Sequence, residues 1–203
     1  MAARHRSNPL ALAVLICLGE RPMHPYEIAA TLRQRQKHES VRLNYGSLYA
    51  VVAALERRGL IAALETQRDG RLPERTVYRL APQGSIEAQD WLTDLLSTPT
   101  KEYPSFEAAL SFLPALPPGQ VRDLLGERIQ RLELDVAHAQ AARELAEKQG
   151  VPRLFWVEDE YRTAMREAEL TYVRALCRDL GDRTLDGVEW WASLHDDDEA
   201  LGD

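Results

Sequence analysis

Cysteine is scarce in this chain, which has two, Cys17 and Cys177, among 203 residues. The two lie far apart in the sequence and show no Cys-x-x-Cys spacing. The sequence therefore predicts neither a disulfide framework nor a zinc site. Both cysteines lie within apolar helical patterns, and we expect them to be reduced thiols in the core.

Long hydrophobic runs are also missing, and no apolar segment is long enough to cross a bilayer. The apolar stretch LALAVLICLG at 10–19 is short, and the basic ARHRSNP before it is similar to the start of a signal peptide. No small-residue cleavage site follows it. We expect a buried helix here, in a cytoplasmic protein without a membrane partner.

The motifs of common enzyme chemistries are absent as well. We find no Ser–His–Asp set, no glycine-rich phosphate loop, no cluster of metal ligands and no paired carboxylates held in a fixed frame. The sequence predicts a protein that is not an enzyme, with no catalytic residues, no metal and no cofactor.

Charge is unevenly distributed along the chain. Residues 1–80 contain 13 Lys/Arg and 7 Asp/Glu, a net charge of +6, whereas residues 81–203 contain 12 and 25, a net charge of −13. A basic first part suits a polyanionic partner, and an acidic second part does not.

The order of elements in the first part is typical of one fold class. Apolar periodicity predicts helices at 10–20, from Pro25 onward and within 43–61, and the last of these ends at Gly59. The strand-like LIAALETQ and RTVYRL follow, joined by a segment that contains Asp69-Gly70, a hairpin signal. Three helices and a hairpin at about 61–80 predict a winged helix-turn-helix.

Gly46 is unusual, because glycine in the first turn of the third helix weakens that helix. In a helix-turn-helix this end of the helix enters the major groove of DNA, where a missing side chain allows a close approach. Tyr49 could instead be a core residue. The arginines in and beside the hairpin loop, Arg68, Arg71 and Arg75 (the wing arginines), could instead belong to an ordinary solvated loop. The candidate DNA-binding residues are Lys37, Arg42, Asn44, Tyr45, Gly46, Ser47, Tyr49, Arg68, Arg71 and Arg75.

The second part of the chain is predicted to be helical and coiled-coil-like. Apolar residues recur at spacings of three and four in 118–149 and in 153–180. A helical hairpin buries one such seam by itself, and we expect a second copy of the chain to cover the rest. The candidate dimerisation residues are Val121, Leu125, Ile129, Leu132, Val136, Leu154, Val157, Tyr161 and Tyr172.

Aromatic residues, 7% of the whole chain, gather near its end. Trp156, Trp190 and Trp191 are candidates for a pocket that binds a small planar effector. The alternative is that they belong to the dimer core and interface, where aromatic residues are enriched.

Three stretches resemble one known family. PMHPYEI at 22–28, GSLYAVVAALERRGLI at 46–61 and RTVYRLAPQG at 75–84 are similar to the signature stretches of PadR-like transcriptional regulators. The resemblance implies a winged DNA-binding module and a C-terminal helical dimerisation region, and some family members bind small planar ligands. Pro25, Val77 and Ala81 depart from the family pattern, and Ala81 replaces a threonine that would cap the following helix.

These observations predict a mainly α protein. We expect a DNA-binding domain at 1–97, a dimerisation domain at 98–195 and a disordered acidic tail at 196–203. The predicted function is that of a homodimeric repressor that binds a pseudo-palindromic operator in double-stranded DNA. The alternative is a protein–protein adaptor whose winged module does not bind DNA.

Overall fold

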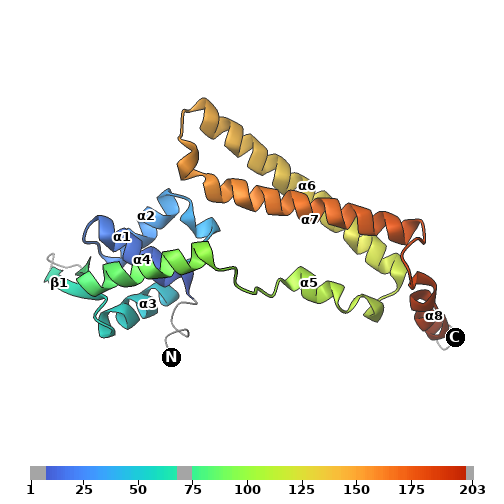
Figure 1. Ribbon diagram of the computed structural model, residues 1–203, viewed down its shortest axis with the longest axis horizontal. Coiled ribbons are helices and arrows are strands. Elements are labelled where there is room, and N and C mark those ends of the chain that lie inside the picture. Colours follow the sequence, from blue (N-terminus) through green and yellow to red (C-terminus); the bar gives the residue numbers. More distant parts are fainter. Residues whose placement is uncertain (1–7, 68–74, 200–203) are drawn as a thin grey trace. The chain divides into compact units, whose positions relative to one another are not determined.

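The computed structural model of the chain describes residues 8–67 and 75–199. It divides the chain into two compact units, Met1–Lys101 and Glu102–Asp203 (Figure 1). Each unit has its own hydrophobic core. Arg68 and Arg71 of the predicted wing lie outside the described residues.

The first unit is a winged helix-turn-helix. Its elements are α1 (Pro9–Glu20), α2 (Pro25–Gln34), the short 3-10 helix η1 (Lys37–Glu39), α3 (Tyr45–Arg57), β1 (Ile61–Gln67), β2 (Arg75–Leu80) and α4 (Pro82–Ser97). The predicted order of three helices followed by a hairpin is thereby confirmed.

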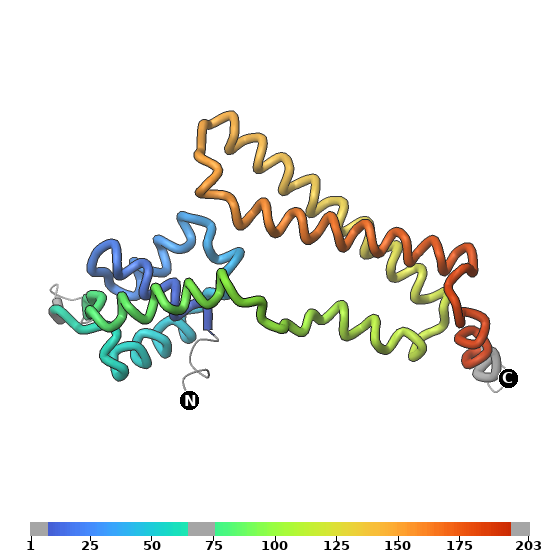
Figure 2. Tube along the Cα trace, in the orientation of Figure 1, coloured from blue at the N-terminus to red at the C-terminus, as the bar shows by residue number. Residues whose placement is uncertain are grey.

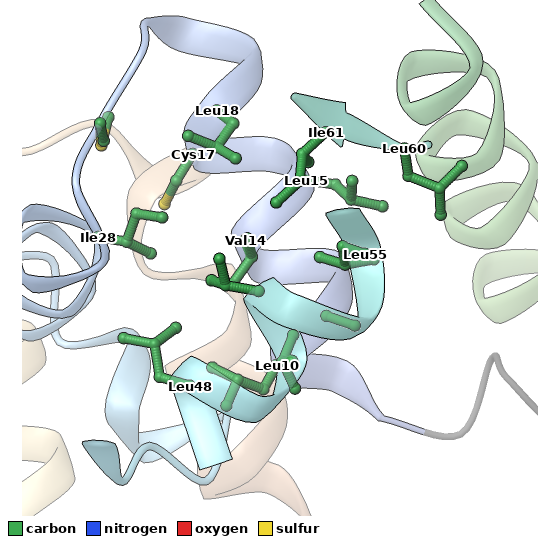
Figure 3. Packing of buried hydrophobic residues seen from close by; sticks show 14 of the residues in the cluster. Leu10, Val14, Leu15, Cys17, Leu18, Ile28, Leu48, Leu55, Leu60 and Ile61 are labelled. Atoms are coloured by element: carbon green, nitrogen blue, oxygen red, sulfur yellow. The ribbon is translucent and has the colours of Figure 1, made fainter. Parts of the chain in front are cut away.

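The core of this unit surrounds α1 (Figure 3). Val14 and Leu15 are fully buried, because α1 contacts α2, α3, α4 and β2. A helix covered on several sides needs apolar residues around its circumference, which explains the near-continuous apolar run of its sequence. Leu48 of α3 and Ile28 of α2 complete the same core, so α2 and α3 are held firmly on α1.

The ends of the helices follow from particular residues. At the start of α2, His24 Nδ1 accepts a hydrogen bond from Tyr26 N (3.1 Å), and Glu27 Oε2 accepts one from His24 N (2.8 Å). At the end of α3, Gly59 takes a left-handed backbone (φ 69°), as the sequence predicts. Ala81 precedes α4 without a side-chain cap, in agreement with its departure from the family pattern.

The wing is an antiparallel pair of strands attached to the rest of the unit. The register shifts between Ala63 and Glu65, so β1 carries a bulge. Met23, just before α2, exchanges two backbone hydrogen bonds of 3.0 Å with Tyr78 of β2. A two-stranded hairpin is marginal alone, and this bridge fixes the base of the wing beside the start of α2.

The second unit is built on a long helical hairpin (Figure 2). Its elements are α5 (Ser105–Leu110), η2 (Leu113–Ala115), α6 (Pro118–Lys148), η3 (Arg153–Phe155), α7 (Val157–Gly181) and α8 (Val188–Glu199). Helix α8 extends to Glu199, into the segment 196–203 for which a disordered acidic tail is predicted. Residues 200–203 lie outside the described part.

The seam of this hairpin differs from the predicted one on one side only. The α6 residues Val121, Leu125, Leu132 and Val136 are buried, and Ile129 packs partly against the same core. On α7, the buried stripe consists of Leu170, Val173, Leu176 and Leu180.

The predicted α7 residues lie elsewhere. Leu154, Val157, Tyr161 and Tyr172 are exposed by 48–76%, and Leu154 belongs to η3 rather than to α7. Both stripes of α7 repeat at spacings of three and four, and periodicity alone does not show which one α6 covers. The predicted α6 residues pack against α7 within the same chain, and for that reason they are not a free dimer surface.

None of the helices among the described residues is both long enough and apolar enough to cross a membrane.

Candidate nucleic-acid interface

The start of α3 is capped by its own sequence. Asn44 has an extended backbone, and its Oδ1 accepts a hydrogen bond from Ser47 N at 2.7 Å. The cap satisfies one of the first backbone N–H groups of the helix, and the N–H groups of Tyr45 and Gly46 come before the first intrahelical bond. The predicted contact residue Asn44 thus uses its side-chain oxygen within the protein, although the residue as a whole is exposed.

Gly46 is exposed, and nothing in the described part of the protein requires a glycine there. A Cβ atom built on Gly46 would have Asn44 Oδ1 as its nearest neighbour, at an ordinary 3.7 Å. Gly84 is a clear contrast, because a Cβ there would lie 2.0 Å from the carbonyl oxygen of Leu60. Glycine at 84 is explained by internal packing, and glycine at 46 is not.

Helix α3 has one buried face and one exposed face. Leu48, Val52 and Leu55 are at most 2% exposed. Tyr49 is 49% exposed and is not among the side chains of the core, so the interpretation of Tyr49 as a core residue is wrong. Ser47 is half-buried and lies one position before Leu48.

Tyr45 forms a cluster with two residues of α2 that the sequence analysis missed. Its ring stacks with that of Tyr26, with 6.2 Å between the centroids. Arg33 donates a hydrogen bond to Tyr45 Oη (2.8 Å), and its guanidinium carbon lies 4.7 Å from the centroid of the Tyr45 ring. Tyr26 and Arg33 are seven positions apart, which is about two helical turns. This spacing places them on the same face of α2, and it is the signal in the sequence that could have predicted this pair.

The other predicted basic residues are more scattered. Lys37 lies half-buried in η1, and Arg42 is exposed in the segment before α3. Arg75 opens β2, and only its backbone is described. The described structure thus brings Tyr45, Gly46, Ser47 and Tyr49 together on the first turns of one helix.

Several arginines of the same unit are neutralised by carboxylates. Arg35 forms a bidentate pair with Glu20 (2.6 and 2.8 Å), and its hydrogen bond lowers the pKa of Glu20. Arg21 lies 3.3 Å from Glu27. The hydrogen bond from the His24 N–H and then that from Arg21 lower the pKa of Glu27.

The three predicted effector-pocket tryptophans do not form one pocket. Trp156 precedes α7, and Trp190 and Trp191 lie in α8 beyond its far end (Figure 1). The 25 residues of α7 separate them by roughly 37 Å along the helix. Trp191 is buried and donates from Nε1 to the Leu116 carbonyl oxygen (2.8 Å), and Trp190 is 62% exposed.

A different hollow exists in the second unit. It has a volume of about 420 Å³ and lies between the α5–η2 segment and α6. Phe106, Phe112 and Leu116 contribute apolar walls, and charge comes from Glu127, Arg128, Arg131 and Asp135. Arg128 is paired with Glu169, and Arg131 with Glu127. Arg128 also stacks on the ring of Phe106, 3.8 Å from its centroid.

Candidate metal ligands do not gather anywhere in the part of the chain that the structure describes. No group of three or more His, Cys, Asp or Glu residues there could hold a metal ion. Cys17 is buried and Cys177 is half-buried, and both are free thiols.

Part of the first unit is similar to a known family. Residues 14–90 match the model of the "Transcriptional regulator PadR-like family". No curated protein matches the sequence.

Solved structures match a larger part of the chain. Bacillus subtilis PadR in complex with operator DNA has a TM-score of 0.66 and 17% identity, covering 85% of this chain and 99% of its own. The same protein in complex with p-coumaric acid has a TM-score of 0.66 and 15% identity, with coverages of 85% and 98%. The Vibrio cholerae virulence activator AphA has a TM-score of 0.64 and 16% identity, with coverages of 86% and 99%. At these identities the likeness establishes the fold of both units.

Proposed function

The chain carries a domain of the PadR-like family of transcriptional regulators at residues 14–90, and we propose that it is a cytoplasmic, sequence-specific DNA-binding repressor that acts as a homodimer. Its partner is a pseudo-palindromic operator, and the start of α3 enters the major groove of each half-site. The wing arginines Arg68, Arg71 and Arg75 neutralise phosphates of the duplex or enter its minor groove.

One observation carries this proposal. The first turns of α3 present Tyr45, Gly46 and Tyr49 to the outside, on the part of the chain with a net charge of +6. Tyrosines that only stabilised the fold would be expected in its core, and a glycine without an internal reason weakens the helix. Both features are explained when a DNA duplex covers this end of α3.

The test begins with a random pool of DNA duplexes from which the purified full-length chain selects its binding sites. We expect a selected duplex to bind with an affinity that falls steeply as salt concentration rises, because phosphate contacts release counterions. Gly46→Glu places a carboxylate at the groove and should abolish binding without changing the oligomeric state. A Gly46→Glu variant that binds normally would show that α3 is not the recognition helix.

The homodimer is supported by apolar residues that the second unit leaves exposed. Val157, Tyr161, Met165 and Tyr172 on α7 are exposed by 48–69%. Their spacing places them along one side of α7, separate from the stripe that packs against α6. A second copy of the chain would bury this side of α7, and light scattering on the purified chain measures whether it does.

A small planar effector is the second ligand of the proposal. Bacillus subtilis PadR has been solved with p-coumaric acid, a planar aromatic acid. In this chain the hollow beside α6 combines the ring of Phe106 with Arg128 and Arg131, so an acid bound there would compete with the carboxylates of Glu169 and Glu127 for these arginines. Leu116 lines the hollow and accepts the hydrogen bond of Trp191, so Trp191 fluorescence should change when p-coumaric acid is added. Release of operator DNA in the same titration would support the proposal, and unchanged fluorescence and affinity would contradict it for this acid.

A further inference from the structure

A cluster of tyrosine and arginine side chains connects the two helices of the helix-turn-helix at their outer surface. Arg33 lies in the last turn of α2 and Tyr45 opens α3, twelve positions later. Tyr26, at the other end of α2, stacks with the Tyr45 ring at an interplanar angle of 10°. Tyr26 and Tyr45 keep 60% and 43% of their surface exposed, so the cluster lies against solvent rather than in the core.

Arg33 differs from its neighbours in what it contacts. Arg35 and Arg21 are held by Glu20 and Glu27. Within the described ranges 8–67 and 75–199, Arg33 has no carboxylate within ion-pair distance, and its hydrogen bond goes to a neutral phenol. Its positive charge is held in place without being neutralised.

The hydrogen bond between Arg33 and Tyr45 leaves donors available. A guanidinium has five N–H donors, and Tyr45 Oη accepts from one of its nitrogens, Nη1. Since Oη acts as the acceptor, the single phenolic hydrogen of Tyr45 remains free to donate. Two donors that differ in charge thus lie side by side next to Gly46, and phosphate oxygens accept hydrogen bonds from both types.

We propose that Arg33 is a DNA-contact residue that binds a backbone phosphate, and that Tyr45 is the positioning residue that holds its guanidinium beside the start of α3. The proposal rests on the proposed function and adds α2 to the DNA interface. Fixing the side chain before binding reduces the rotamer entropy that a long arginine loses on binding. Phosphate contacts set the register of the protein on the duplex, so this contact would determine how deeply the first turn of α3 enters the groove.

The test compares variants of the full-length chain on two duplexes, one selected by the wild-type chain from a random pool and one scrambled version of it. Arg33→Gln should weaken binding to both duplexes by a similar factor, ~10-fold, and should reduce the slope of log affinity against log salt by about one. Arg33→Lys should retain the slope and lose part of the affinity, because lysine keeps the charge and not the planar geometry. Arg178→Gln, an exposed arginine of α7, is the matched control and should change neither quantity.

Tyr45→Phe separates positioning from charge. It removes the hydroxyl that holds Arg33, so affinity should fall while the salt slope stays at the wild-type value. In the double variant Arg33→Gln/Tyr45→Phe, the loss of DNA affinity caused by Tyr45→Phe should be smaller than in the wild-type background, because Arg33, the partner of Tyr45, has already been removed. Additive effects of the two substitutions would contradict the positioning role of Tyr45.

The outcomes separate the two proposals. A wild-type chain that selects no duplex would overturn the proposed function itself. A wild-type chain that binds, with an Arg33→Gln variant of equal affinity and equal salt slope, would overturn this inference alone. A loss of affinity in Arg33→Gln without any change in slope would likewise overturn the phosphate contact. Circular dichroism of each variant verifies that it is folded. If Arg33→Gln does not fold, the comparison of affinity and salt slope is made with Arg33→Lys.

Discussion

At the scale of single residues, glycine occurs at positions 84 and 46 for two different physical reasons. Gly84 stands where α4 passes so close to Leu60 that no side chain fits. A Cβ on Gly46 would meet only Asn44 Oδ1, at an ordinary contact distance of 3.7 Å. Gly46 stands out in the sequence because it lies in the first turn of a predicted helix. Gly84 does not, since close contact between distant segments leaves no local pattern.

Gly46→Ala should therefore stabilise the free protein and weaken its binding to DNA. Alanine is favoured over glycine in a helix by up to about 1 kcal/mol, and the new methyl group would meet only Asn44 Oδ1. On the operator the same methyl group would hinder the approach of the helix, and a loss of ~10-fold in affinity is expected. Urea unfolding and DNA titration of the same preparation measure both effects.

The control for Gly46→Ala is Gly126→Ala, within α6. A Cβ on Gly126 would meet nothing within 4 Å. This variant should gain stability of the same order without losing DNA affinity. If Gly46→Ala binds operator as tightly as Gly126→Ala does, close approach at Gly46 is not needed.

Gly84→Ala should have the opposite effect on stability. The added Cβ would lie 2.0 Å from the carbonyl oxygen of Leu60 and 2.8 Å from Leu80 Cδ1, so α4 must shift away from the wing. Overpacking of this kind costs typically about 1–3 kcal/mol of the free energy of unfolding, and the contact with a backbone atom places the cost at the upper end. Thermal unfolding measures it, and a melting temperature equal to that of the wild type would contradict the packing described here.

At the scale of elements, the start of α2 couples a carboxylate to the backbone. Glu27 accepts from the His24 N–H, and this bond holds the pKa of Glu27 below its ordinary 4.5. A lowered pKa means that the carboxylate contributes stability above pH 4.5, and that this contribution disappears as the pH falls through the folded-state pKa. The contribution is small, because 46% of the side chain is exposed.

Glu27→Gln tests that coupling. Glutamine can still accept from His24 N–H but carries no charge. The stability difference between wild type and variant should be constant near neutral pH and should shrink as the solution is acidified below pH 4.5. Urea unfolding over a pH series measures this difference. If the free energies of unfolding of wild type and variant, plotted against pH, remain parallel down to full protonation of the carboxylates, the lowered pKa of Glu27 is contradicted.

The elements also show how far the sequence could predict this fold. Local signals located the three helices, the hairpin and the ends at His24 and Gly59. The pairing of α6 with α7 was predicted too, but the face of α7 was not. Leu170 and Val173 form one stripe and Tyr161 and Tyr172 another, and the choice between them depends on packing with α6. In the proposed DNA interface, the role of Arg33 could not be predicted, because its contact with Tyr45 exists only after α2 and α3 have packed together.

Substitutions in the α6–α7 seam and on the exposed stripe of α7 should have different effects. Leu125→Ala, in the seam between α6 and α7, should lower the free energy of unfolding by about 2–5 kcal/mol. The double variant Tyr161→Asp/Tyr172→Asp should leave the helices formed, since both side chains are more than half exposed in the single chain. It should instead separate the dimer, because two carboxylates per chain would be buried in the interface. Light scattering and circular dichroism distinguish the two effects, and a double variant that remains dimeric would remove these tyrosines from the interface.

At the scale of the whole molecule, the charge difference between the two parts of the chain gives each a separate role. The basic residues 1–80 attract a duplex, and the acidic residues 81–203, with a net charge of −13, repel it. DNA is therefore expected to lie against the winged units and away from the long helices. In the proposed dimer the helical units then set the distance between two DNA-binding units without contacting DNA themselves.

This division of roles makes the spacing of half-sites the sharpest property of the whole assembly. Two recognition helices related by a two-fold axis contact half-sites about one helical turn apart, on the same face of the duplex. Insertion of about 5 base pairs between the half-sites rotates one of them by half a turn. The dimer can then engage only one half-site, and its affinity should fall to that for a duplex with a single half-site. The Tyr161→Asp/Tyr172→Asp variant should bind the original operator and the operator with the insertion equally, because a separated chain has only one α3 to contact a half-site. Equal binding of the two duplexes by the wild-type chain would mean that the two copies do not read the operator together.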